Sequence, residues 1–323
     1  MHKGVAWICA ALVAAPAFAM AQSAANYPTK PIRLIVPYPP GGGSDTVSRA
    51  VARPLSDNLG HQVVVDNRGG AGGNIGMELA AKAPADGHTL VFALTAQLAI
   101  NPALYKKIPY DPIKDFEPIT QLASGPYVLV VHPSLPAKSV KELIALARSS
   151  PGKIAYASSG NGSGGHLANE LLNSMTGIEM QHIPYKGGGP ALVDVLAGNV
   201  KVLFATWSSS KAHIESGRLR ALGVSTDKRL TGVDIPTIAE AGVPGFDAGV
   251  WYAFLAPAGT PKAIVSKLNK EIIKAANHPD AKKVLDRGSI ELVGSSPQEL
   301  AKFMKSELAK WRKVVQESRM KVD

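Results

Sequence analysis

Short apolar runs that lead into glycine-rich turns and then into helical patterns constrain this chain most. Residues 32–36 form one such run, residues 37–45 contain three consecutive glycines, and residues 46–53 have a helical pattern. Residues 62–66 and 67–73 repeat the run and the turn, and a helix is expected at 74–82. Short apolar runs bounded by turn residues indicate buried strands, and this order of elements indicates a parallel α/β sheet.

The turn at residues 37–45 has the composition of an anion-binding site. Gly41, Gly42 and Gly43 lack a Cβ, so the backbone can approach a ligand closely. We expect Ser44 or Asp45 to cap the following helix, whose N-terminus carries a partial positive charge. Backbone N–H groups at such a place bind anions. A tight turn without a ligand is the alternative, because such turns are common.

A second group of glycine-rich turns lies between residues 158 and 189. Residues 158–165 follow an expected strand and open a helix at 166–175, and residues 183–189 lead to Pro190 at an expected first helical position. The two groups predict two α/β domains with a ligand in the cleft between them. Ligands bind at the carboxyl ends of parallel strands in such sheets.

Capping boxes mark two further helix starts, at Ser139 with Glu142 and at Ser296 with Glu299. The second box opens an amphipathic helix with an apolar stripe that we expect to be core. Its members are Leu300, Phe303, Met304, Leu308, Trp311 and Val315. Residues 101–118 read as a loop with short helical turns, and residues 128–131 as a strand.

Residues 1–21 have the pattern of a secretory signal peptide. Lys3 precedes an apolar, alanine-rich run, and Ala19-Met20-Ala21 offers a small-x-small cleavage site. A membrane anchor is less favoured because the run is short and no second run of spanning length follows. Cys9 lies inside this segment, so the mature chain has no cysteine for disulfide, zinc-thiolate or nucleophile chemistry.

The mature chain is basic, with a formal charge of (35 − 1) − 25 = +9. An exported basic protein of this kind suits anionic small molecules. Its Lys and Arg residues are dispersed, without a basic run interleaved with aromatics, which argues against nucleic acid as a partner. The sequence has no metal-ligand spacing, and no cofactor or metal is expected.

Two enzyme readings compete with ligand binding. Residues 160–165 match GxGxxG, but the acid expected about 20 residues later is missing, with only Glu179 and His182 nearby. A hydrolase would use Ser163, His166 and Asp194. Ser163 lacks the G-x-S-x-G elbow, and His166 belongs to the same helix start, so we expect no catalytic residue. His166 either contacts the ligand or is satisfied by the backbone.

Several motifs from about residue 27 to the C-terminus together resemble the Bug family, the TctC-like periplasmic solute receptors of tripartite tricarboxylate transporters. They are Ile35-Val-Pro-Tyr-Pro-Pro-Gly-Gly-Gly-Ser-Asp45, Asn67-Arg-Gly-Gly-Ala-Gly-Gly73, Ala85-Asp-Gly-His-Thr89, Tyr110-Asp-Pro-Ile-Lys-Asp-Phe116, Gly164-Gly-His-Leu167, Ile183-Pro-Tyr-Lys-Gly-Gly-Gly-Pro190, Pro236-Thr-Ile-Ala-Glu-Ala-Gly242 and Ala256-Pro-Ala-Gly-Thr-Pro261. His88 is the one mild departure, since the family commonly has tyrosine there.

The resemblance implies a type II periplasmic-binding-protein-like Venus flytrap with two α/β domains. The first would comprise residues 27–125 plus 250–323, and the second residues 126–249. It also implies a monomer that is soluble in the periplasm after signal-peptide cleavage and binds a small organic carboxylate. Membrane transporter subunits are the implied partner, and a ligand sensor for a signalling partner is the alternative.

The residues implied for ligand binding lie on both domains. They are Tyr38, Gly41, Gly42, Gly43, Ser44, Asp45, Thr95, Gln97, Ser158, Gly162, Ser163, His166, Gly187, Gly188 and Thr206. Residues 39–44 and residues 158–165 contain no Lys or Arg, so we expect neutral donors to hold the carboxylate, with Lys186 at the rim. Gly42 is expected to need a positive φ that a β-branched residue cannot adopt.

Overall fold

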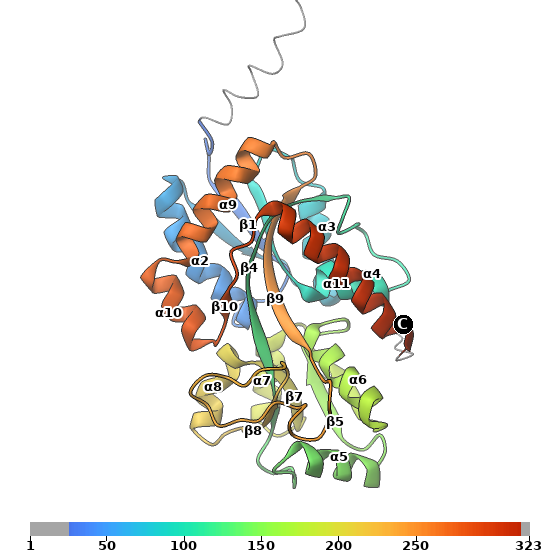
Figure 1. Cartoon of the computed structure of the whole chain (residues 1–323). Coiled ribbons are helices and arrows are strands. Elements are labelled where there is room, and N and C mark those ends of the chain that lie inside the picture. The colour runs from blue at the N-terminus through green and yellow to red at the C-terminus, as the bar shows by residue number, and fades with distance from the viewer. Residues whose placement is uncertain (1–25, 318–323) are drawn as a thin grey trace, which may run out of the picture.

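The computed structural model describes residues 26–317, and its strands form one curled sheet. The expected signal peptide, residues 1–21, lies outside the described residues. The strand order is β2-β1-β3-β9-β4-β7-β5-β6, with β8 and β10 also pairing with β4. Two lobes share this sheet, one above the other (Figure 1). None of the described helices combines the length and apolar content needed to cross a membrane.

The upper lobe contains the first strands and the last helices of the chain. Its strands β1, β2 and β3 run parallel, while β9 is antiparallel to β3. The strands are β1 (Ile32–Val36), β2 (Val63–Asn67), β3 (Thr89–Leu94), β9 (Gly249–Pro257), β10 (Glu291–Leu292) and the first part of β4 (Phe116–Val131). The helices are α2 (Gly43–Leu59), η1 (Ala71–Gly73), α3 (Asn74–Ala81), η2 (Ala96–Ile100), α4 (Asn101–Leu104), α9 (Lys262–Ala276), α10 (Pro279–Arg287) and α11 (Pro297–Glu317).

Helices cover both faces of the upper sheet. The helices α2, α9 and α10 lie on one side of the long strands, and α3, α4 and α11 lie on the other (Figure 1). Each side has its own hydrophobic core, with Val51 and Leu268 on the first and Met77 and Met304 on the second. The expected apolar stripe of α11 is confirmed, since Phe303 is partly buried and the other five members are buried.

The lower lobe is built from a continuous stretch of chain. Parallel strands β5 and β6 lie at one edge, and β7 and β8 pair with the end of β4. Its elements are α5 (Val140–Ser149), β5 (Ala155–Ser158), α6 (Gly164–Thr176), β6 (Gln181–Pro184), α7 (Gly188–Leu196), β7 (Val202–Thr206), α8 (Trp207–Glu215) and β8 (Arg220–Val224). The glycine-rich turns open α6 and α7 as expected, although Pro190 is the third residue of α7 and not the first.

Strand β4 is longer than the sequence indicated. It covers residues expected to be loop up to 118 as well as the expected strand at 128–131. The prolines and the glycine within this strand argued against a continuous strand in the sequence. The strand accommodates its irregular part by shifts of register after Pro118 and after Gln121. Its partner changes from β9 at Pro126 to β7 at Tyr127. This change supports the domain boundary expected at 125/126, which stays a prediction.

Both expected serine caps form, but only the box at Ser296 and Glu299 is reciprocal. Ser139 Oγ accepts from the Glu142 N–H at 3.2 Å, and Ser296 Oγ accepts from the Glu299 N–H at the same distance. The Glu299 carboxylate accepts from the Ser296 N–H at 2.8 Å, which completes the reciprocal pair. In the first box the carboxylate of Glu142 reaches the Lys138 N–H instead, at 2.6 Å.

Candidate functional site

A cavity of about 60 Å³ lies where the two lobes meet. One buried water molecule needs about 10–15 Å³ of cavity volume. This cavity is several times larger, so it has room for a small molecule. Its walls contain glycines at helix starts, hydroxyl groups and apolar side chains. The lining residues are Tyr38, Pro39, Gly42, Gly43, Ser44, Leu94, Tyr127, Ser159, Gly188, Leu203, Phe204, Ala205, Thr206 and Ser209. None of these has an ionisable acid, Lys, Arg or His side chain.

The first glycine-rich turn brings five of its residues, Tyr38, Pro39, Gly42, Gly43 and Ser44, to the cavity wall. Gly42 precedes α2 with φ −89°, so the expectation of a positive φ at Gly42 is wrong. Gly41 is the residue in the left-handed region, with φ 88°. Gly43 is required for a different reason, because a Cβ there would lie 2.7 Å from Thr206 Oγ1 of the lower lobe.

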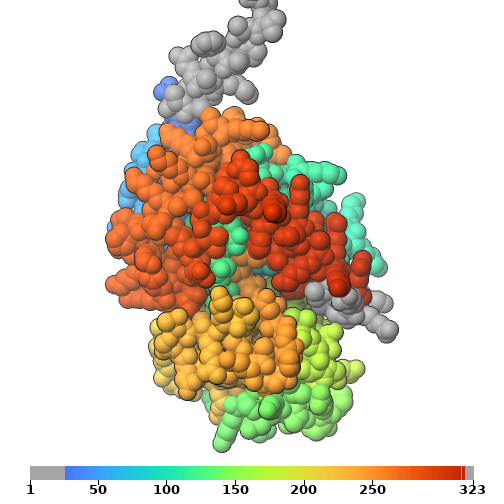
Figure 2. All heavy atoms as spheres, in the orientation of Figure 1, coloured from blue at the N-terminus to red at the C-terminus, as the bar shows by residue number. Residues whose placement is uncertain are grey.

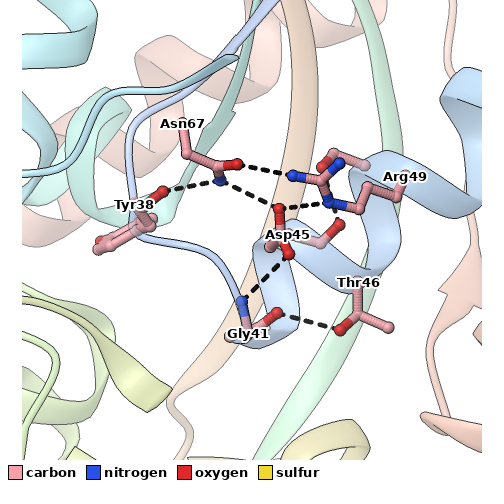
Figure 3. Close-up of polar contacts among 8 residues, drawn as sticks. Tyr38, Gly41, Asp45, Thr46, Arg49 and Asn67 are labelled. Carbon is pink, nitrogen blue, oxygen red and sulfur yellow. Dashed lines mark hydrogen bonds and ion pairs between the residues drawn. The ribbon is translucent and has the colours of Figure 1, made fainter. Parts of the chain in front are cut away.

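Asp45 holds this turn from behind (Figure 3). Its Oδ2 accepts from the Gly41 N–H at 3.1 Å, and its Oδ1 accepts from Arg49 Nε at 2.9 Å and Asn67 Nδ2 at 3.0 Å. Asn67 also donates to the Tyr38 carbonyl at 2.9 Å. The expected side-chain cap is wrong, since α2 begins at Gly43 without one. Asp45 shapes the turn and does not line the cavity.

Gln97 and Thr95 lie behind the wall. Gln97 Nε2 donates to the Tyr38 hydroxyl at 2.8 Å and to the Gly72 carbonyl at 2.7 Å, which fixes the Tyr38 ring beside the cavity. Burial raises the pKa of Tyr38 to about 12, so this hydroxyl stays neutral. Thr95 Oγ1 accepts from the Trp251 N–H at 2.9 Å and joins β3 to β9.

The second glycine-rich loop, residues 158–163, is held by neutral groups. Gly162 N–H donates to His166 Nδ1 at 3.1 Å, and Ser158 Oγ lies 2.6 Å from His182 Nε2. Ser163 caps α6 by accepting from the His166 N–H at 3.4 Å. Of this loop only Ser159 lines the cavity, so Ser158, Gly162, Ser163 and His166 act as support in this structure.

Two imidazoles stack beneath this loop. The His166 and His182 rings are 4.0 Å apart with 15° between their planes, and Tyr156 stacks on His182 at 4.9 Å. Burial, and secondly the neighbouring His182, lowers the pKa of His166 to about 3. Burial lowers the pKa of His182 to about 4. No local sequence pattern marks the role of His182, because its contacts depend on β6 lying beside β5.

The lobes also meet at the start of α7. Gly188 lines the cavity, and Gly187 precedes the helix against Pro39, whose Cδ would be 2.8 Å from an added Cβ. Tyr105 of the upper lobe donates to the Asn161 carbonyl of the lower lobe at 2.8 Å. Gly187 has both a close neighbour and a positive φ of 155°, whereas an added Cβ at Gly188 would meet no atom within 4 Å.

The structure therefore divides the expected site residues into two groups. Those at the cavity wall are Tyr38, Gly42, Gly43, Ser44, Gly188 and Thr206. Those behind the wall are Gly41, Asp45, Thr95, Gln97, Ser158, Gly162, Ser163, His166 and Gly187. Several wall residues were missed, among them Tyr127, Leu94 and Ser209. Leu94 ends β3 as Thr206 ends β7, so its position at a strand end was the available signal.

The residues of the hydrolase reading do not form a triad. Ser163 Oγ meets the backbone of His166, while the His166 ring faces Gly162 and His182. Asp194 accepts from Tyr185 and from Asn199 Nδ2, so neither histidine nor serine is its partner. The catalytic reading has no geometric support.

A larger groove lies elsewhere on the surface, with a volume of about 940 Å³. The green atoms of β4 appear at its floor between α10 and α11 (Figure 2). Its rim carries charges of both signs, including Asp227, Arg229 and Lys310. No glycine-rich helix start opens onto it, so the smaller cavity between the lobes is the better candidate for ligand binding.

Known proteins share both the sequence and the fold. A model of the tripartite tricarboxylate transporter family receptor matches residues 47–320. Protein BugT of Bordetella pertussis is 40% identical over 318 residues, covering 98% of this chain and 96% of BugT. The R. palustris protein Rpa4515, solved with adipate, is 38% identical with a TM-score of 0.88, covering 91% of this chain and 99% of that one.

A second solved structure is MatC from Rhodopseudomonas palustris with bound malate. It is 31% identical with a TM-score of 0.86, and the match covers 90% of this chain and all of MatC (100%). The expected periplasmic-binding-protein fold is thereby confirmed, as is the expectation that the chain is not an enzyme. The chain belongs to the tripartite tricarboxylate transporter receptor family, whose members are periplasmic solute-binding proteins.

Proposed function

We propose that this receptor binds a small organic carboxylate in the cavity between its lobes and delivers it to membrane subunits of a tripartite transporter. The observation that carries the proposal is the chemistry of the cavity wall. The starts of α2 and α7 and the hydroxyls of Ser44, Ser159 and Thr206 meet there, without a charged side chain. Helix N-termini and hydroxyl donors suit an anion.

Family membership and the sequence support the proposed location and the proposed partner. The relatives solved with adipate and malate support a carboxylate as ligand. The pattern of residues 1–21 supports export and cleavage, which mass spectrometry of the periplasmic fraction tests. An intact Met1 would contradict it.

Binding of acids tests the central part of the proposal. We expect isothermal titration to show binding of succinate, malate or adipate, and none of succinamide, which has the shape of succinate without its charge. Equal binding of succinate and succinamide would contradict an anion site. Absence of binding by every acid of the panel would contradict the proposed function itself.

We further propose that the lobes close on the ligand about the strand crossings near residues 126 and 249. The hydrogen bond from Tyr105 to the Asn161 carbonyl joins the lobes, and opening of the cleft would break it. We expect small-angle scattering to give a smaller radius of gyration with saturating ligand than without it. An unchanged radius would indicate a rigid site.

A further inference from the structure

Strand β9 carries a buried hydroxyl that has no partner in the described part of the chain. Tyr252 of β9 is fully buried, and its hydroxyl has no hydrogen-bond partner among residues 26–317. An unsatisfied buried hydroxyl costs free energy, so folded proteins rarely keep one unless a ligand or water supplies the partner. We therefore expect a ligand or a water molecule to form a hydrogen bond with the Tyr252 hydroxyl.

The strand pairing places this side chain on the cavity side of the sheet. Tyr252 lies directly opposite Leu94 in the antiparallel pair of β9 and β3. Opposite residues of such a pair project from the same face. Leu94 lines the cavity, and Tyr38, Tyr127 and Tyr252 belong to the same buried cluster as Leu94.

A second hydroxyl points to the same place. Tyr127 lines the cavity, and its hydroxyl lies so close to the start of α6 that a Cβ on Gly164 would be 2.2 Å from it. Burial raises the pKa of Tyr127 well above its ordinary value, and the nearby Tyr252 and Tyr38 raise it further. Both phenols are therefore neutral donors, and they lie near each other.

We propose that the hydroxyls of Tyr252 and Tyr127 bind a second oxygen-bearing group of the ligand. A neutral phenol O–H donates to an acceptor oxygen such as that of a carboxylate. Apolar Leu94, Leu203 and Phe204 form the wall beside it and suit a short carbon chain. The receptor thus selects acids with two acceptor groups over simple alkanoic acids. This rests on the proposed function.

Removing one hydroxyl tests this inference. Succinate with butyrate, and adipate with hexanoate, are pairs that differ by the second carboxylate. We expect Tyr252→Phe to reduce the preference for the diacid in each pair by about tenfold, because a hydrogen bond to a charged group is lost. The ligand-free variant should unfold at the wild-type temperature or above it, since an unsatisfied hydroxyl has been removed.

Tyr27→Phe is the matched control. Its hydroxyl is buried and donates to the Gly87 carbonyl at 2.6 Å, away from the cavity lining. We expect this control to lower the unfolding temperature and to leave the diacid preference unchanged. The same diacid preference in Tyr252→Phe and wild type would overturn the inference and leave the proposed function standing. A fall in the unfolding temperature of Tyr252→Phe equal to that of Tyr27→Phe would also overturn the inference. If the wild type bound no acid, both the inference and the proposed function would be wrong.

Discussion

The two glycine-rich segments that face each other across the cavity are held in different ways. A carboxylate with an Arg and an Asn fixes the upper turn, at Asp45, Arg49 and Asn67. Neutral imidazoles and a serine fix the lower loop, at His166, His182 and Ser158. A short glycine-rich backbone cannot hold its own shape, so each segment depends on side chains that do not touch the ligand space.

The difference has an electrostatic meaning. Asp45 places a negative charge in the first turn of α2, where its carboxylate uses the Gly41 N–H and not the groups facing the cavity. The lower loop, residues 158–163, contains no Asp or Glu. The histidines that support it are uncharged near neutral pH. We infer that a bound carboxylate meets less repulsion from the lower loop than from the upper turn.

The largest expected effect comes from removing the carboxylate of Asp45, which supports the upper turn. We expect Asp45→Ala to lower the free energy of unfolding by about 2 kcal/mol, because the Gly41 N–H and Asn67 lose a buried charged acceptor. Urea unfolding measures it. Asp286 is the matched control, since it also pairs with a cation four residues away but its side chain is 60% exposed. Asp286→Ala should cost less than about 0.5 kcal/mol.

An equal cost at Asp45 and Asp286 would show that the upper turn does not depend on its carboxylate. The comparison between a charged and a neutral support would then fail. The control removes the general effect of deleting one acid from a basic chain, since both variants change the net charge by the same amount.

The second effect concerns the contact between the lobes. We expect Gly43→Ala to weaken succinate binding by about tenfold, because its Cβ would meet Thr206 Oγ1 at 2.7 Å and oppose closure. Isothermal titration of a double-mutant cycle tests this cause. Once Thr206→Ala has removed the obstructing atoms, Gly43→Ala should add no further loss. A full additional loss in the double variant would show that the clash is not the cause.

The neutral histidines beneath the lower loop predict that the stability of the protein depends on pH. The pKa values of His166 and His182, about 3 and about 4, lie below the ordinary value of about 6.5, so the unfolded chain takes up protons first as pH falls. The stability given by the neutral rings is complete above about pH 6.5 and is lost progressively toward pH 4. Tyr156 and Glu170 are the other titratable groups at this stack.

We expect His182→Phe to keep the stacking, to lose about 1 kcal/mol of stability at pH 7.5 with the Ser158 contact, and to have a flatter curve between pH 6.5 and 4. Chemical unfolding at a series of pH values measures both. The exposed His278, changed to Asn, is the control for loss of an imidazole. Parallel curves for wild type and His182→Phe would mean that this histidine does not take part in the acid response.

The smallest effect is expected for Lys186. Its side chain is exposed and does not line the cavity, so Lys186→Ala should change succinate affinity by less than about threefold. Titration at two salt concentrations should show a weak dependence for the same reason. A loss larger than that of Gly43→Ala would place a cation at the centre of recognition.

The α/β class, the glycine-rich helix starts and six of the fourteen cavity-wall residues could be predicted from the sequence, because strand–turn–helix patterns and capping boxes are local. The supports behind the wall could not be predicted in the same way. Asp45 looked like a ligand contact until the positions of Arg49 and Asn67 were known. Tyr127 and Tyr252 lie on strands that bring distant parts of the chain together, and no local pattern marks them.

The strand order also has a consequence for how the chain folds. The upper lobe leaves its sheet open between β3 and β4 until β9 arrives more than 100 residues later. The lower lobe, apart from the end of β4 on which it builds, needs only the chain between β4 and β9. A chain growing from its N-terminus therefore has a complete lower lobe while β3 still has an unpaired edge. Insertion of β9 closes that edge, and we expect it to be the late step of folding.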